Sequence, residues 1–208
     1  MDLASISSLA TAAGTLVLAV ATFASVRSAN RAARAAERSL LAGLRPLLLP
    51  SDFHDAEQKV LFIDRKWVMV PGGCGAAEYE NGNVYLAASF RNAGPGLALL
   101  HSWYFHAEYD PGLPVPELSR FRRLTRDLYL PPGGIGYWQG ALREQSDPDF
   151  EAARKLIEGG SPIQIDLLYG DSEGGQRTIT RFTLQPRQHS GWLVTVSRHW
   201  NVDRPDPR

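Results

Sequence analysis

A run of uncharged residues near the N-terminus restricts what this chain can fold into. Twenty-four residues, from Leu3 to Val26, carry no charged side chain. As a helix they would extend roughly 36 Å at 1.5 Å per residue, which is enough to cross a ~30 Å hydrocarbon core. A buried helix of a soluble protein rarely needs so long an uncharged run. The sequence therefore predicts a transmembrane helix over residues 3–26.

The hydrophobicity of this run is moderate. Nine strongly apolar residues favour insertion by roughly 3 to 5 kcal/mol in total, whereas seven Ser/Thr residues and Gly14 oppose it. A secretory signal peptide is an alternative, but it would begin with basic residues. Only Asp2 and the terminal amine precede the run. We therefore expect a membrane anchor.

Four arginines follow the run in a helix-forming segment that we assign to a stalk, residues 27–44. At about 100° per residue, their spacing of four, three and four places them on one stripe. The stripe is a candidate contact for anionic lipid headgroups, and the alternative is a solvated face that only sets topology. By the positive-inside rule, a single-pass protein in the cell membrane would have its N-terminus outside and its C-terminal domain in the cytoplasm. The four residues are Arg27, Arg31, Arg34 and Arg38.

Small residues are frequent in the predicted span, where Ala10 and Gly14 lie four apart. Small residues allow helix backbones to approach closely, so the N-terminal helix is a candidate for self-association. The expected partners of the chain are therefore the lipid bilayer, a second copy through this helix, and an unknown protein.

The sequence pattern changes at Arg45. From there, short runs typical of β-strands alternate with clusters of Gly, Pro and Asp. One helix interrupts them, with Asp147 as the expected N-cap, Pro148 at its first turn and Gly159 at its end. The residues that follow position 200 form a predicted flexible tail, 201–208. The expected strands cover residues 47–49, 59–63, 67–70, 83–91, 97–108, 124–130, 135–139, 163–169, 176–184 and 192–198.

This pattern predicts a mainly β domain over residues 45–200. An antiparallel immunoglobulin-like β-sandwich with one short helix fits the number and spacing of the strands. A partly open barrel is the alternative. In the segment 97–108, strand alternation puts Leu99 and His101 on the face of Trp103 and Phe105, with Leu100 on the opposite face.

The charge distribution excludes a general nucleic-acid binder. Residues 1–45 contain five Arg and two acidic residues, a net charge of +3, so the remaining 163 residues carry −3. A phosphate backbone needs a clustered basic surface, which the C-terminal domain lacks as a whole. The single cysteine, Cys74, excludes an internal disulfide.

No catalytic motif, cofactor-binding motif or metal-ligand spacing stands out, so we expect no enzyme, no cofactor and no metal. His54 lies between Asp52 and Asp55, which is the one local cluster with metal-ligand chemistry, but such a segment is more often a solvated turn. Cys74 lies in a Gly-rich turn and is expected to be exposed, without an identified base. Whether Cys74 or the His54 cluster is functional stays open.

A second basic run surrounds the expected strand at 124–130. It contains Arg120, Arg122, Arg123 and Arg126. One interpretation is a patch that meets lipid or an acidic partner. The favoured interpretation is an edge strand whose charges prevent pairing with another chain.

Three features together resemble a group of uncharacterised single-pass membrane proteins of actinobacterial type. They are the apolar and then Arg/Ala-rich N-terminus ending near Arg45-Pro46, the breaker Arg91-Asn92-Ala93-Gly94-Pro95-Gly96, and the late hairpin with Leu168-Tyr169-Gly170-Asp171 and Gly174-Gly175-Gln176-Arg177-Thr178. The resemblance implies an N-terminal helix, a stalk and a β-sandwich, and no activity.

The sequence thus favours a membrane-anchored cytoplasmic binding or scaffold module of unknown partner. One alternative is a cryptic enzyme whose site is assembled in three dimensions. The other is an effector that disturbs the membrane.

Overall fold

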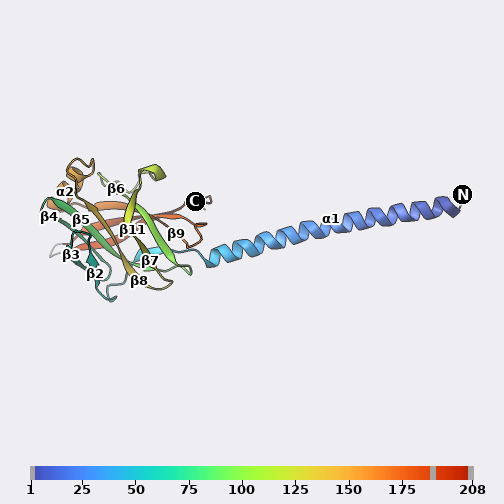
Figure 1. Cartoon of the computed structure of the whole chain (residues 1–208), viewed down its shortest axis with the longest axis horizontal. Helices are drawn as coiled ribbons and strands as arrows, with labels where there is room; N and C mark the ends of the chain where they lie inside the picture. Colours follow the sequence, from blue (N-terminus) through green and yellow to red (C-terminus); the bar gives the residue numbers. More distant parts are fainter. Residues whose placement is uncertain (1–2, 188–190, 206–208) are drawn as a thin grey trace. The chain divides into compact units, whose positions relative to one another are not determined.

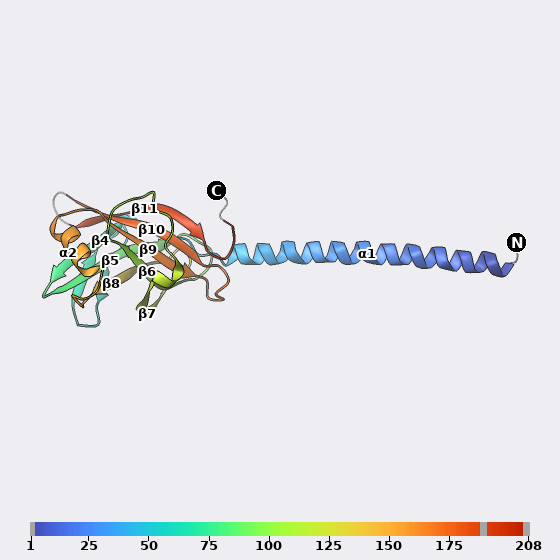
Figure 2. The same ribbon diagram turned by 90° about the horizontal axis from the view of Figure 1, so that it is seen from above.

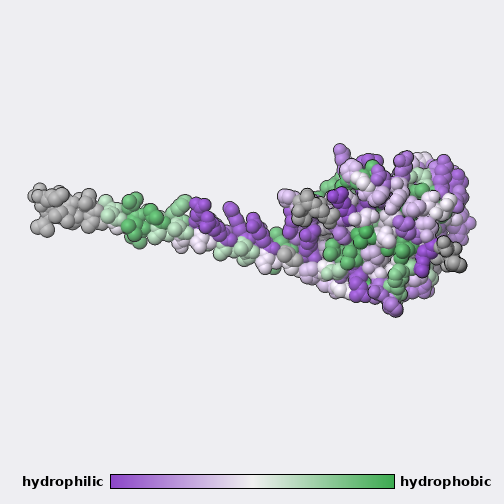
Figure 3. All heavy atoms as spheres, turned by 180° about the vertical axis from the view of Figure 1, so that it is seen from behind, coloured by the Kyte–Doolittle hydropathy of each residue, from purple (hydrophilic) through white to green (hydrophobic). Residues whose placement is uncertain are grey.

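The computed structural model describes residues 3–187 and 191–205, and the chain divides into two compact units, Met1–Ala42 and Gly43–Arg208. The first unit is one continuous helix, α1 (Leu3–Gly43). Large apolar side chains between Leu16 and Val26 are 53–69% exposed. In Figure 3 this apolar stretch gives way to a hydrophilic one farther along the helix. Among the described residues, Thr11–Leu41 is the one helical segment long and apolar enough to span a membrane by length and composition.

The second unit is built around a nine-stranded antiparallel sheet whose strand order is β1-β5-β4-β11-β10-β9-β6-β7, with β8 paired to β5. A separate hairpin is formed by β2 and β3. The strands are β1 (Leu48–Pro50), β2 (Gln58–Leu61), β3 (Trp67–Val70), β4 (Cys74–Glu80), β5 (Asn83–Asn92), β6 (Ala98–His106), β7 (Arg122–Leu130), β8 (Ile135–Leu142), β9 (Ile163–Gly170), β10 (Thr178–Pro186) and β11 (Trp192–Asn201).

The sheet curls into a half-barrel (Figures 1 and 2). On one side of β5 the residues up to Ala88 pair with β4 and the last three pair with β1, while β8 occupies the other side. This arrangement leaves β7 and β8 as the two ends of the curled sheet. The immunoglobulin-like sandwich is not confirmed, because the main strands belong to one hydrogen-bonded sheet instead of two facing sheets. The alternative expectation of a partly open barrel is nearer to the structure.

The core fills the concave side of the half-barrel. Alternation along β5, β9 and β10 sends every second side chain inward, and aromatic rings interlock there, with Phe90 and Phe182 at 4.3 Å between ring centroids. The β2–β3 hairpin covers the outer face of β5 and β8, where Phe62 packs edge-on against Tyr85. The segment 107–121, which includes the short 3-10 helix η1 (Leu118–Arg120), covers the outer face of β9 and β10.

The helix α2 (Phe150–Glu158) packs on the sheet through buried Phe150 and Ala153. It begins two residues later than the sequence predicts, with Asp149 at the N-cap position. The Asp147 carboxylate instead accepts the backbone N–H of Asp149 at 2.9 Å and is held by Arg122. Asp147, the predicted N-cap, therefore links the start of α2 to Arg122 in the segment 122–130.

Two further expectations were wrong. No strand was predicted between residues 71 and 82, but residues 74–80 form β4. Cys74, at the start of β4, is buried instead of exposed. In β6, Leu100 shares the core with Trp103 and Phe105, because a register irregularity at His101 adds one residue and reverses the alternation. The alternation of apolar and polar residues in a sequence does not reveal a bulge of this kind.

The segment that leads into the sheet is clamped by Asn92, whose side chain is fully buried. Its amide oxygen accepts the backbone N–H groups of Leu47 at 3.1 Å and Gly94 at 3.0 Å. Its amide nitrogen donates to the carbonyls of Gly96 and Leu130. A Cβ on Gly94 or Gly96 would lie within 2.4 Å of the backbone of residues 44–47. The breaker after β5 therefore acts as a cradle for the chain that precedes β1.

Candidate functional site

The most distinctive site of the domain is the open seam between β7 and β8. These strands follow each other in the chain and are joined by the turn Pro131–Gly134, yet β7 pairs with β6 and β8 pairs with β5. They lie in contact without forming a ladder. The two strands therefore diverge from their connecting turn, and the wall of the half-barrel is interrupted between them.

The register of β5 shows which backbone groups of β8 face this seam. Ser51 donates its N–H to the carbonyl of Ser89, and Ala93 donates to that of Leu47, so odd-numbered residues of β5 bond toward β1. Because backbone direction alternates along an antiparallel strand, even-numbered residues of β5 bond toward β8. Their partners are Gly136, Trp138, Gly140 and Leu142. The backbone groups of Ile135, Tyr137, Gln139 and Ala141 consequently point toward the seam.

The other wall of the seam is a bulged part of β7. Leu100 of β6 lies opposite Leu128, and Ser102 lies opposite Arg123, so four residues of β7 face His101 alone. The segment 124–127 is therefore a bulge, with three more residues than the facing part of β6.

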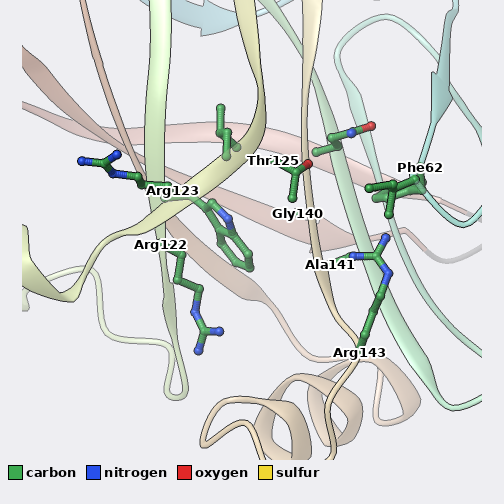
Figure 4. A pocket seen from close by; sticks show the side chains of 11 residues that line it. Phe62, Arg122, Arg123, Thr125, Gly140, Ala141 and Arg143 are labelled. Atoms are coloured by element: carbon green, nitrogen blue, oxygen red, sulfur yellow. The ribbon is translucent and has the colours of Figure 1, made fainter.

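A cavity of about 220 Å³ occupies the wide part of the seam. The Trp103 ring forms its floor and packs edge-on against Trp138, with 5.3 Å between ring centroids. Gly140 permits this packing, because a Cβ there would lie 2.9 Å from Trp103. Figure 4 shows the lining: Phe62, Ile63, Trp103, Arg122, Arg123, Leu124, Thr125, Gln139, Gly140, Ala141 and Arg143.

Arginine side chains, instead of backbone hydrogen bonds, tie β7 to the elements across the seam. Arg122 of β7 binds Asp147 and Asp149, which follow β8, through its terminal nitrogens. The hydrogen bonds from Arg122 lower the pKa of Asp147 below its ordinary value, although partial burial alone would raise it. Arg126 of β7 donates to the carbonyl of Leu61 at 2.9 Å. These links hold β7 in place where the ladder is missing.

Arg143 stands at the opposite side of the opening from Arg122, and Arg123 points away from it (Figure 4). Arg143 donates from Nε to Asp64 at 3.2 Å, and Tyr85 donates its hydroxyl to the same carboxylate at 2.6 Å. Burial alone would raise the pKa of Asp64, but these hydrogen bonds lower it. Among the described residues, the two terminal amino groups of Arg143 have no hydrogen-bond acceptor, so they are free to bind an anion at the cleft.

Gln139 adds an unusual polar group to the cleft. Its side chain is 6% exposed, and its Oε1 atom has no hydrogen-bond partner among the described residues. A buried amide oxygen without a donor is costly, by about 1–3 kcal/mol.

A second polar cluster lies on the outer face of β6, β9 and β10. Asp166, fully buried, accepts from Nε and Nη2 of Arg181 at 2.7 and 2.8 Å, and His106 Nε2 lies 2.9 Å from the same carboxylate. Arg181 also donates to the carbonyls of Leu113 and Pro114. The cluster therefore clamps the segment 107–121 onto the sheet. We interpret it as structural, because the Asp166 carboxylate is saturated by its neighbours.

The structure separates the residues that the sequence singled out. Arg27, Arg31 and Arg34 line one open hollow along α1, and Arg38 lies on the same exposed helix. His54 is exposed and hydrogen-bonds Asp52 at 2.9 Å. Among the described residues, no group of three His, Cys, Asp or Glu side chains could hold a metal ion.

The basic run around β7 divides between two faces. Arg120 donates to the Tyr104 hydroxyl at 2.6 Å on the outer face, whereas Arg122 and Arg126 link the seam. Sequence reasoning missed Trp103, Gln139 and Arg143 as site residues. Two glycines four residues apart on one face of β8, Gly136 and Gly140, were the local signal of close packing there.

Comparisons of this chain with family models, with curated proteins and with solved structures found no match.

Proposed function

We propose that this protein is a membrane-tethered binding module, with α1 as its anchor, its domain in the cytoplasm and the seam between β7 and β8 as its binding site. The observation that carries the proposal is the exposure of the apolar part of α1. Six large apolar side chains between Leu16 and Val26 are each more than half exposed. In water such a surface is unfavourable, since burying one side chain of this kind is worth about 1.5–3 kcal/mol.

The charge pattern of α1 supports the orientation. Basic residues follow the apolar stretch on the C-terminal side, and this asymmetry favours a cytoplasmic domain. In that arrangement Arg27 and Arg31 lie nearest the headgroups, where each arginine gains about 1 kcal/mol from an anionic surface.

The open seam supports a binding function for the domain. Native sheets usually protect their edges, because unpaired backbone groups recruit another strand. Here the backbone groups of β8 are directed into a cleft with a tryptophan floor and a guanidinium group at its rim. Convergent polar groups around an apolar floor are the usual composition of a ligand site.

The anchor is tested by expressing the full chain and extracting membranes with alkaline carbonate. We expect the wild-type protein to stay in the pellet and a Leu18→Arg/Val20→Arg variant to move to the soluble fraction. Ala33→Arg, on the stalk, is the matched control and stays in the pellet. Quantitative extraction of the wild-type protein would overturn the anchor.

Orientation needs a separate measurement. Two reporter enzymes are fused in turn after residue 208, one that is active only in the cytoplasm and one that is active only outside it. We expect activity from the first. Activity from a reporter that works only outside the cytoplasm contradicts the proposed topology.

A further inference from the structure

We infer that the seam binds an extended acidic peptide segment, which adds as a short strand to the free edge of β8 and places a carboxylate against Arg143. This inference rests on the proposed binding function and names the class of partner. It follows from three properties of the cleft: its backbone groups, its charge and the arrangement of its two faces.

The backbone groups define the ligand's main chain. Tyr137, Gln139 and Ala141 each direct an N–H and a C=O toward the seam, so donors and acceptors recur at every second residue, roughly 7 Å apart. An extended peptide presents the complementary groups with the same repeat, which is the basis of strand addition.

The charge of the cleft selects an acidic segment. Its described lining includes three arginines and no carboxylate. Arg122 is bound by Asp147 and Asp149 behind the lining, and Arg123 points away from the opening (Figure 4). Arg143 is bound by Asp64, but through Nε alone. Its remaining amino groups can bind a carboxylate in the fork geometry that guanidinium favours.

The two faces of the seam select an alternating pattern. On the inner face, Trp103 lies beneath Gly140, where an apolar side chain would pack. On the outer face, Arg143 lies against Tyr85 and beside the turn that carries Phe62 and Ile63. Successive side chains of a strand point to opposite faces. A bound segment would therefore alternate apolar residues with Asp or Glu.

The probe is the peptide acetyl-VEVEV-amide with a fluorescent label, titrated against the full chain in lipid nanodiscs. We expect saturable binding that weakens about tenfold when Gln replaces both Glu residues. Two N-methylated peptides separate strand addition from simple attraction between charges. Methylation of the amides on one edge of the peptide should abolish binding, and methylation on the opposite edge should leave it unchanged.

Protein variants locate the site. Arg143→Gln is expected to weaken binding about tenfold, while Arg154→Gln, on α2 and outside the cleft, leaves it unchanged. Ala141→Pro removes an amide that faces the seam without removing a ladder bond to β5, so it should abolish binding. If that variant does not fold, the N-methylated peptides on the wild-type chain give the same information.

Several results would overturn the inference. They are no binding at millimolar peptide, equal binding of both N-methylated forms, or equal weakening by Arg143→Gln and Arg154→Gln. Carbonate extraction distinguishes this failure from failure of the proposed function. A chain that stays in the membrane pellet but ignores the peptide retains its anchor and loses this class of partner.

Discussion

Arg126 of β7 donates a hydrogen bond from Nη2 to the backbone carbonyl of Leu61 at 2.9 Å, which ties β7 to β2 of the hairpin that covers β8. β7 thus gains a side-chain link on the side where it has no backbone ladder. Arg122 makes a second such connection, to Asp147 and Asp149. The stability of β7 should therefore depend on these arginines more than that of a fully paired strand would.

Removing the Arg122 link is expected to destabilise the domain. Arg122→Gln and Asp147→Asn should each lower the free energy of unfolding. We expect a coupling of about 1–2 kcal/mol between them, because the hydrogen bonds that join these two mostly buried side chains are charge-assisted. A double-mutant cycle by urea denaturation measures this coupling. Additive effects of the two substitutions would show that the pair contributes nothing specific.

The same pair predicts a pH dependence. The pKa of Asp147 is lower in the folded domain than in the unfolded chain, where it is about 3.9. A lowered carboxyl pKa stabilises the fold above the unfolded value, and this contribution is lost as pH falls through the folded pKa. The stability difference between wild type and Asp147→Asn should be constant above about pH 5 and shrink below about pH 4. A difference that does not change between pH 6 and pH 3 is incompatible with the Arg122 link.

Asn92 is expected to be among the most sensitive positions of the domain. Its fully buried amide makes four hydrogen bonds, which tie together the segment before β1, the breaker after β5 and the end of β7. Asn92→Ala leaves these backbone groups unpaired and should cost roughly 3 kcal/mol or more. Asn83→Ala, where one long hydrogen bond of 3.4 Å is lost, should cost less than about 0.5 kcal/mol. Thermal and urea unfolding of the two variants gives the comparison.

Gly140 sets the floor of the cleft. In Gly140→Ala, the new methyl group would lie 2.8 Å from Trp138 and 2.9 Å from Trp103. Overpacking of this kind typically costs about 1–3 kcal/mol, and a shifted tryptophan emission should accompany it. Gly175→Ala is the control, because its Cβ would meet nothing within 4 Å. Equal stability of both variants would mean that the two rings do not pack across Gly140.

The sequence predicted the individual strands better than their arrangement. Runs such as 163–169 alternate clearly, and the structure has β9 there. β4 was missed because its Gly, Ala and Glu content hides its strand character. The bulge at His101 reversed the predicted faces of β6, since one added residue exchanges the two sides of a strand.

The seam could not be predicted for a different reason. β7 and β8 are joined by a short turn and would be expected to form a hairpin, but strand pairing is decided by long-range packing. β7 pairs instead with the preceding strand, β6, across the segment 107–121, and β8 pairs with β5, which is separated from it in the chain by β6 and β7. The role of Asn92 could not be predicted for the same reason. The sequence showed a turn after β5, but the four backbone groups that bind the Asn92 amide come from three separate segments.

The central claim, that the half-barrel is open between β7 and β8, is tested most directly by amide hydrogen exchange along β8. In the full chain, the amides of Trp138, Gly140 and Leu142 bond to β5 and should be protected, whereas those of Tyr137, Gln139 and Ala141 should exchange much faster. Uniform protection of all six amides would contradict the account, because it would mean that β7 and β8 pair and close the barrel.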